Sequence, residues 1–162
     1  MTEATLCILV CEEPAKYVLL GLKKAGFGAG KYGGFGGKIE EGETVETAAL
    51  RELEEETGVR VLPEHLNYVA RLEFLFPARP NWNHHVHVFL ATSWLGEPQE
   101  TREMSPEWFP VDDLPFEAMW QDGRHWLPRI LSGERIMGHF TFRADNETVE
   151  TMRVWDWEEQ AK

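Results

Sequence analysis

The chain has 162 residues, of which 43% are hydrophobic and 27% charged, and its formal net charge is −12. This length suits one globular domain, and the composition excludes a disordered or fibrous chain. The negative charge argues against a protein that binds long nucleic acid, because such proteins neutralise phosphates with basic side chains.

The first residues and the two cysteines indicate where the protein works. No apolar run approaches the roughly 20 residues that span a bilayer, and residues 1–5 lack the segments of a signal peptide. Cys7 and Cys11 would lie about 13 Å apart on one strand, too far for a disulfide, and we interpret both as reduced core residues. We expect a cytoplasmic monomer without membrane contact, forming a single domain over residues 1–162.

Two predicted strands precede a glycine-rich segment. Residues 5–11 and 16–22 are β-rich apolar runs, separated by a turn at Glu12-Glu13-Pro14. Residues 26–37 contain seven glycines, which excludes the interior of an ordinary helix or strand. Five lysines and no acid lie between residues 16 and 38. This stretch either meets a small phosphate ligand or carries solubilising lysines on a loop.

A helix is predicted over residues 44–57. Thr44 is a suitable N-cap, an apolar face runs from Val45 to Leu53, and Gly58 stands where a left-handed residue ends a helix. Strand patterns follow at residues 66–76 and 85–94, with a loop marked by Pro77 and Pro80. The order of these elements predicts a mixed sheet.

The last third of the chain predicts a helix and a hairpin. Residues 110–113 form a turn into a short helical segment, and residues 123–131 form a second helix that is kinked or begins near Pro128. Residues 136–143 and 148–155 alternate around Asp145-Asn146, which suits a tight turn. We expect an α/β sandwich with helices packed against a central sheet.

Three carboxylates share one face of the first predicted helix. At 100° per residue, Glu52, Glu55 and Glu56 fall within an arc of about 100°. Like charges at this spacing oppose folding unless they lie in open solvent or hold cations. Oxygen ligands favour Mg²⁺, with Mn²⁺ as a substitute. The alternative is a solvated acidic helix face.

The surrounding residues match a family signature. Gly37, five residues, Glu43, seven residues and then Arg51-Glu52-Leu53-Glu54-Glu55-Glu56-Thr57-Gly58-Val59 resemble the signature of Nudix hydrolases. The resemblance implies the Nudix fold, a mixed β-sheet in an α/β/α sandwich, and metal-dependent cleavage of a nucleoside diphosphate linkage. It further implies a metal and catalytic role for Glu52, Glu55 and Glu56, a backbone ligand at Gly36 or Gly37, and a structural ion pair between Arg51 and Glu43.

Further motifs resemble one branch of the family, the MutT-type enzymes that convert oxidised purine nucleoside triphosphates such as 8-oxo-dGTP to monophosphates and pyrophosphate in nucleotide-pool sanitation. They are residues 21–30, 34–38, 87–89 and 115–120. The resemblance implies that Phe27 and Trp120 stack on the base, although ordinary core packing is the alternative. It also implies that Asp122 reads the edge of the base, Lys23 faces the ligand and Glu103 adds a carboxylate near the metal.

Several positions depart from this branch. Gly33 replaces an asparagine that binds the base, Gly123 replaces a second aspartate, and Leu72 replaces an aromatic residue. We therefore predict a purine nucleoside triphosphatase with altered or relaxed base choice. Two alternatives stay open: hydrolysis of capped or dinucleotide polyphosphates, and a nucleotide sensor without turnover. His85 and His87 share a strand face, but no cysteine or third spaced histidine supports a zinc site.

Overall fold

The computed structural model describes residues 1–13 and 15–158 and contains one mixed sheet. Neighbouring strands follow the order β3-β2-β1-β5-β4-β7-β8, and β6 also pairs with β2. The β1–β5 and β4–β7 pairs are parallel, whereas the other pairs are antiparallel. The strands are β1 (Thr2–Cys11), β2 (Tyr17–Lys23), β3 (Tyr32–Gly33), β4 (Asn67–Leu75), β5 (His84–Ala91), β6 (Met104–Pro110), β7 (Ile136–Phe142) and β8 (Val149–Asp156).

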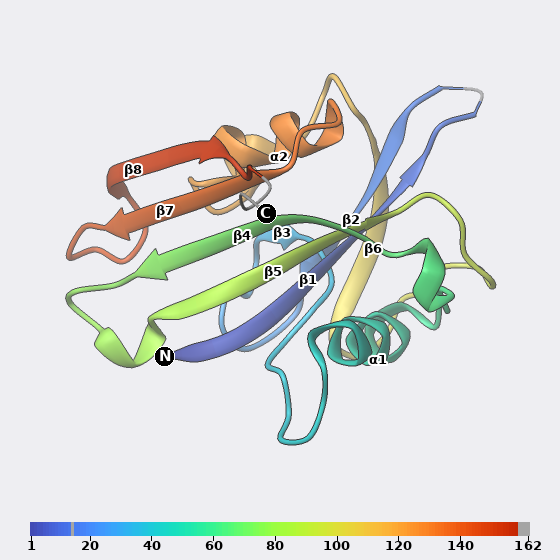
Figure 1. The fold of residues 1–162 in the computed structure, drawn as a ribbon, viewed down its shortest axis with the longest axis horizontal. Coiled ribbons are helices and arrows are strands. Elements are labelled where there is room, and N and C mark those ends of the chain that lie inside the picture. Colours follow the sequence, from blue (N-terminus) through green and yellow to red (C-terminus); the bar gives the residue numbers. More distant parts are fainter. Residues whose placement is uncertain (14, 159–162) are drawn as a thin grey trace.

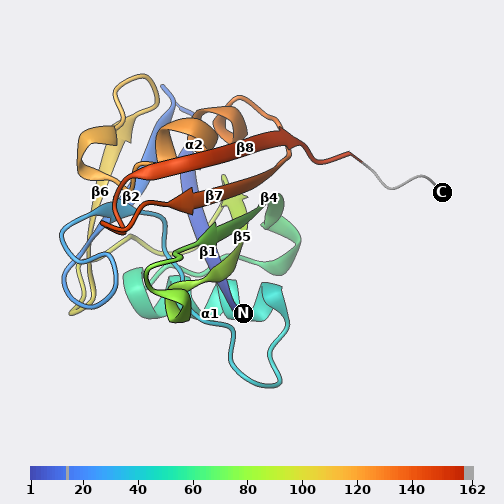
Figure 2. The same cartoon turned by 90° about the vertical axis from the view of Figure 1, so that its left-hand side faces the viewer.

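Helix α1 (Val45–Thr57) and helix α2 (Gly123–Leu131) lie on opposite faces of the sheet, as Figures 1 and 2 show. The predicted mixed sheet in an α/β/α sandwich is therefore confirmed. The described residues also contain three single-turn 3₁₀ helices: η1 (Pro63–His65), η2 (Pro80–Trp82) and η3 (Phe116–Ala118). In the part of the chain described, no helix combines the length and apolar character needed to cross a bilayer.

The ends of α1 are fixed by the residues that the sequence indicated. Thr44 Oγ1 accepts a hydrogen bond from Thr47 N–H at 3.1 Å, and Thr47 Oγ1 accepts one from Thr44 N–H at 2.9 Å. Gly58 has φ of 80° and donates its N–H to the Glu54 carbonyl at 2.8 Å. These caps set where α1 begins and ends, and so which side chains it turns toward the sheet.

Three details differ from the sequence predictions. Strand β6 was not predicted, because Pro106 and Pro110 interrupt its pattern; proline is tolerated here because β6 pairs on one side only, with β2. Cys11 is only half-buried, whereas Cys7 lies in the core as expected. Strand β1 begins at Thr2, three residues before its predicted start. Helix α2, by contrast, has the predicted bounds, and it runs through Pro128 because burial of its apolar face outweighs the loss of one helical hydrogen bond.

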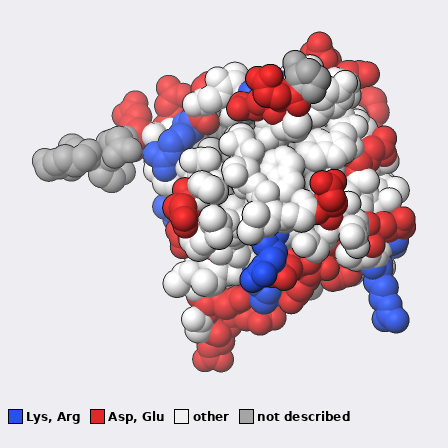
Figure 3. Space-filling model, turned by 90° about the vertical axis from the view of Figure 1, so that its right-hand side faces the viewer, with Lys and Arg blue, Asp and Glu red and all other residues white. Residues whose placement is uncertain are grey.

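The surface carries the excess of acidic groups unevenly. On the face shown in Figure 3, Asp and Glu side chains surround a largely uncharged centre, and Lys and Arg are few. This face offers no continuous basic track of the kind that follows a nucleic-acid backbone.

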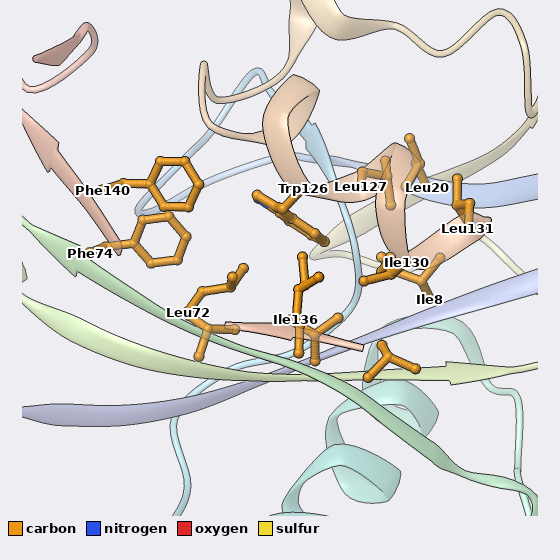
Figure 4. Close-up of a cluster of buried hydrophobic side chains, with 14 of the residues drawn as sticks. Ile8, Leu20, Leu72, Phe74, Trp126, Leu127, Ile130, Leu131, Ile136 and Phe140 are labelled. Carbon is orange, nitrogen blue, oxygen red and sulfur yellow. The ribbon is translucent and has the colours of Figure 1, made fainter. Parts of the chain in front are cut away.

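Two apolar cores lie on the two faces of the sheet. Figure 4 shows the larger one, in which Trp126, Leu127 and Ile130 of α2 point toward side chains from the sheet. The smaller core packs Ala49 and Leu53 of α1 against the other face. Burial alternates along β7, where Ile136, Gly138, Phe140 and Phe142 face the larger core. Both helices are thus anchored to the sheet by their apolar sides, and the polar side of α1 is left for the site.

Candidate active site

A cavity of about 520 Å³ opens beside the larger core. Its lining includes side chains from β1, β2, β4, β5 and the start of α2, together with the glycine-rich segment. The structure brings together in this lining the residues predicted to bind substrate, Lys23, Phe27, Gly33, Trp120 and Asp122, and the backbone candidates Gly36 and Gly37. Residues far apart in the chain therefore form one site.

Glu52 and Glu56 of α1 approach Gly37 and Gly36, which line the cavity, although the α1 carboxylates themselves are not part of its lining. Glu56 is only 3% exposed, and its Oε1 accepts the Gly36 N–H at 2.9 Å. Burial raises the pKa of Glu56 to about 8, and the nearby charges of Glu52 and Glu103 act in the same direction. Burial also raises the pKa of Glu52, to which Glu55 and Glu103 contribute. The predicted acidic cluster thus exists, and Glu103 belongs to it.

The two glycines before Lys38 lie very close to neighbouring groups, and only at Gly36 are these neighbours backbone atoms. A Cβ added to Gly36 would lie 1.8 Å from the Thr5 carbonyl oxygen, and one added to Gly37 would lie 2.5 Å from Glu52 Oε2. The Gly37 carbonyl accepts the Thr5 N–H at 2.9 Å. The backbone of this segment therefore touches β1 on one side and the carboxylates on the other.

Arg51 links the loop before α1 to the carboxylates. Its Nε donates to Glu43 Oε2 at 2.6 Å and its Nη2 to Glu43 Oε1 at 3.0 Å, so the predicted ion pair is bidentate. Its Nη1 lies 3.1 Å from Glu52 Oε2 and 3.2 Å from Glu55 Oε1. In the described residues, no three His, Cys, Asp or Glu side chains are already arranged to hold a metal ion. The Glu52 and Glu55 carboxylates are turned toward Arg51.

We expect Arg51→Lys to lower the free energy of unfolding by about 1–2 kcal/mol, because an ammonium cannot reproduce the two parallel bonds to Glu43. The matched control is Arg60→Lys, since Arg60 Nε lies 3.7 Å from Glu54 Oε2 in an exposed pair that contributes little. Urea denaturation of both variants checks the prediction. Equal stabilities of the two would contradict a structural role for the Arg51–Glu43 pair.

Asp122 is the buried carboxyl of the cavity. Its Oδ2 accepts the Trp126 Nε1–H at 2.7 Å, and burial raises its pKa to about 6. The folded state thus binds this proton more tightly than the unfolded state, in which the carboxyl has its ordinary pKa of 3.8. The contribution of Asp122 to the free energy of unfolding is therefore fully present below pH 3.8 and is lost as the pH rises through about 6.

Asp122→Asn should remove this pH dependence while an amide oxygen still accepts the Trp126 N–H. We expect the variant to gain up to about 3 kcal/mol relative to the parent between pH 4 and pH 7, from a difference of roughly two pKa units. Denaturation curves at several pH values test this. If the free energy of unfolding depends on pH in the same way in both proteins, Asp122 is not the group that titrates.

The predicted stacking residues contact each other. The rings of Phe27 and Trp120 lie 5.2 Å apart at an interplanar angle of 21°. A base inserted between them would need more space than this separation provides, so the base meets an outer face of the pair or one ring moves. Phe27 is 40% exposed, whereas a residue of the ordinary core would be buried.

The lysines of the basic stretch divide into two groups. Lys23, Lys31 and Lys38 line the cavity, and Lys31 Nζ lies 5.0 Å from the centre of the Trp120 ring and 2.9 Å from Glu147 Oε1, with which it forms an ion pair. Lys16 and Lys24 are absent from the lining: the first donates to the Leu131 carbonyl, and the second pairs with Glu100. Only part of the stretch is therefore available to a phosphate ligand.

The sequence reasoning missed an aromatic group at the cavity. Phe27 makes edge contacts with Trp82 at 4.9 Å, with His84 at 5.8 Å and with Phe76 at 6.2 Å. All four residues line the cavity. The alternation of β5 could have revealed His84, because it is in phase with the buried Val86 and Val88.

The other two histidines of this strand have partners on the opposite face. His85 lies between Glu3 and Glu73, with nitrogen–oxygen distances of 2.8 and 3.2 Å. His87 Nε2 lies 2.7 Å from Glu3 Oε1, and its Nδ1 contacts the Tyr68 hydroxyl. These contacts agree with our interpretation of both as strand histidines, not zinc ligands.

Comparisons with known proteins bear on this site. The model of the NUDIX domain family matches residues 1–130. A protein of Danio rerio named oxidized purine nucleoside triphosphate hydrolase is 43% identical over 149 residues, which cover 92% of this chain and 93% of the relative. An 8-oxo-dGTP diphosphatase of Escherichia coli is 39% identical over 87 residues, covering 49% of this chain and 62% of the relative.

Among solved structures, the mutator MutT protein of Bacillus halodurans superimposes with a TM-score of 0.77. The match covers 95% of this chain and 97% of that one, at 24% sequence identity. At this identity the likeness concerns the fold alone.

Proposed function

We propose that this chain, which belongs to the NUDIX domain family, hydrolyses purine nucleoside triphosphates, oxidised ones included, to nucleoside monophosphate and pyrophosphate. The observation that carries the proposal is the contact between Gly36 and Glu56, which joins the acidic cluster of α1 to the cavity. The relative from Danio rerio, which is similar over 93% of its length, is named for the hydrolysis of oxidized purine nucleoside triphosphates, and this supports the proposal.

The oxygen atoms of the acidic cluster are the kind of ligand that a hard divalent cation prefers. The cluster offers carboxylate oxygens on Glu52, Glu55, Glu56 and Glu103, and the mutual repulsion of Glu52, Glu56 and Glu103 is relieved by a cation. We propose Mg²⁺, with Mn²⁺ as a substitute. Binding requires the Glu52 and Glu55 carboxylates to turn away from Arg51, whose bidentate bonds to Glu43 can stay in place.

The chemistry that a bound divalent ion supplies is neutralisation of phosphate charge and a lowered pKa for water. The chain contributes the remaining parts. Lys23 lines the cavity, and its positive charge lowers the pKa of Glu56, which supports our proposal that its ammonium binds the phosphates near the carboxylates. We assign to Glu56 the acceptance of a proton from the attacking water, because the Gly36 N–H fixes its carboxylate beside the segment that lines the cavity.

The base would lie at the aromatic end of the cavity. Phe27 and Trp120 offer ring faces for stacking, and Asp122 is the buried polar group beside them. Gly33 and Gly123 supply no side chain that could hydrogen-bond a base. We therefore propose altered or relaxed base choice within the purines.

Removal of divalent ions provides the direct test. We expect pyrophosphate release from purine nucleoside triphosphates to fall to background in EDTA and to return with excess Mg²⁺ or Mn²⁺. Product analysis should show monophosphate and pyrophosphate, not diphosphate and phosphate. Turnover that survives EDTA would contradict the proposal, and so would a marked preference for capped nucleotides, dinucleotide polyphosphates or sugar nucleotides.

The same proposal includes how the protein occurs in the cell. We propose a monomeric, single-domain cytoplasmic protein that acts on small nucleotides and not on long nucleic acid or membranes. The net charge of −12 supports this choice of substrate size, because a polyanion would be repelled. Gel filtration coupled to light scattering tests the monomer.

A further inference from the structure

His84 stands apart from the other polar groups of the cavity, because aromatic rings surround it. Its ring stacks on Phe74 at 5.2 Å and on Phe76 at 6.3 Å, and meets the edge of Phe27 at 5.8 Å. The imidazole is thus held in one orientation at the aromatic end of the cavity, beside the ring that we assign to the base.

The hydrogen bond at Nδ1 fixes the tautomer. His84 Nδ1 lies 2.7 Å from the Trp82 carbonyl oxygen, which can only accept, so the proton is on Nδ1. Burial lowers the pKa of His84, which keeps the ring neutral at physiological pH. Nε2 therefore carries a lone pair and accepts hydrogen bonds. Among the described residues, Nε2 has no hydrogen-bond partner.

A hydrogen-bond acceptor at the aromatic end of the cavity would add to the few side chains that could bind the edge of a base there. Gly33 has open space around its Cβ position, and Gly123 faces Met119, whose Cε would lie 3.0 Å from an added Cβ; neither glycine contributes a polar side chain. Asp122 is already engaged with Trp126 through one oxygen. An acceptor on the β5 side would supply a second point of recognition, which a base needs if its orientation is to be fixed.

We propose that His84 is a specificity-determining residue whose Nε2 accepts a hydrogen bond from an N–H or amino group on the edge of a purine base. The inference rests on the proposed function, since it assigns the aromatic end of the cavity to the base. It predicts preference for purines that present a donor on that edge over matched purines that lack it.

The test uses two pairs of bases that differ in one amino group, guanine and hypoxanthine, and adenine and unsubstituted purine. A third pair is 8-oxoguanine and guanine, in which N7 changes from acceptor to donor and C8 gains a carbonyl oxygen. Both kcat/KM for the triphosphates and Kd for the monophosphates are measured, the second by calorimetry without divalent ions. His84→Phe keeps a flat ring and removes the acceptor, and His84→Gln restores an acceptor. His65→Phe, on the exposed η1 turn, is the control for exchanging a histidine.

We expect the parent protein to favour the donor-bearing member of at least one pair about tenfold, the effect of one unpaired buried polar group. His84→Phe should abolish that ratio, and His84→Gln should recover part of it, with unchanged melting temperatures. The proposal is overturned if the parent shows no such preference, or if His84→Phe weakens both members of every pair equally. If both proteins hydrolyse triphosphates and His84→Phe keeps the parent's kcat/KM ratio in every pair, only this inference is overturned. If the parent hydrolyses no triphosphate, the proposed function is overturned.

Discussion

Glu56→Gln should reduce pyrophosphate release by about a thousandfold or more while the protein remains folded. The amide keeps the size of the side chain and can still accept the Gly36 N–H, but it can neither take a proton nor bind a cation as a carboxylate does. Steady-state assays at saturating Mg²⁺, together with circular dichroism, measure the two effects. Residual activity within tenfold of the parent would remove Glu56 from the proposed machinery.

Glu56→Gln should lower activity, but without divalent ions it should raise the free energy of unfolding at high pH. The folded-state pKa of Glu56, about 8, lies above the ordinary value of 4.5, so the folded state holds the proton more tightly than the unfolded state does. Stability in EDTA therefore falls as the pH rises from 4.5 to 8, and the variant lacks this loss. We expect Glu56→Gln to be more stable than the parent at pH 9 by on the order of 3 kcal/mol. Glu54→Gln, at an exposed position of α1, should show no such gain.

The parts of the fold that the sequence predicted are those decided by neighbouring residues. Thr44 and Gly58 bound α1 because a cap acts within one turn, and Asn146, with φ of 58°, closes the predicted hairpin between β7 and β8. The strand β6 was missed because its pairing with β2, not its composition, makes it a strand. A local pattern cannot report a partner that lies over 80 residues away in the chain.

The candidate site divides in the same way. The spacing of Glu52 and Glu56 on a helix follows from helical geometry, and their clustering could be predicted. That Phe27 stacks on Trp120 could not, because the contact joins the glycine-rich segment to the turn before α2. No role was predicted for His84 from the sequence, although strand alternation puts it on the opposite face from His85 and His87.

We expect Gly36→Ala to destabilise the protein strongly, although it adds only one methyl group. The added Cβ would lie 1.8 Å from the Thr5 carbonyl oxygen and 2.9 Å from Leu6 Cα, both backbone atoms of β1 that cannot rotate away. The segment must then separate from β1, which disturbs its hydrogen bonds to Thr5 and Cys7. We expect a loss of about 4 kcal/mol or more, and urea denaturation measures it.

Gly33→Ala is the matched control in the same segment. A Cβ at Gly33 meets no atom within 4 Å, so its stability should stay within about 0.5 kcal/mol of the parent. A comparable loss in both variants would show that the segment tolerates no side chain for a reason other than contact with β1. If Gly36→Ala alone unfolds the protein, the close approach to β1 is what holds the Gly36 N–H at Glu56, and the acidic cluster depends on a backbone contact as much as on its own helix.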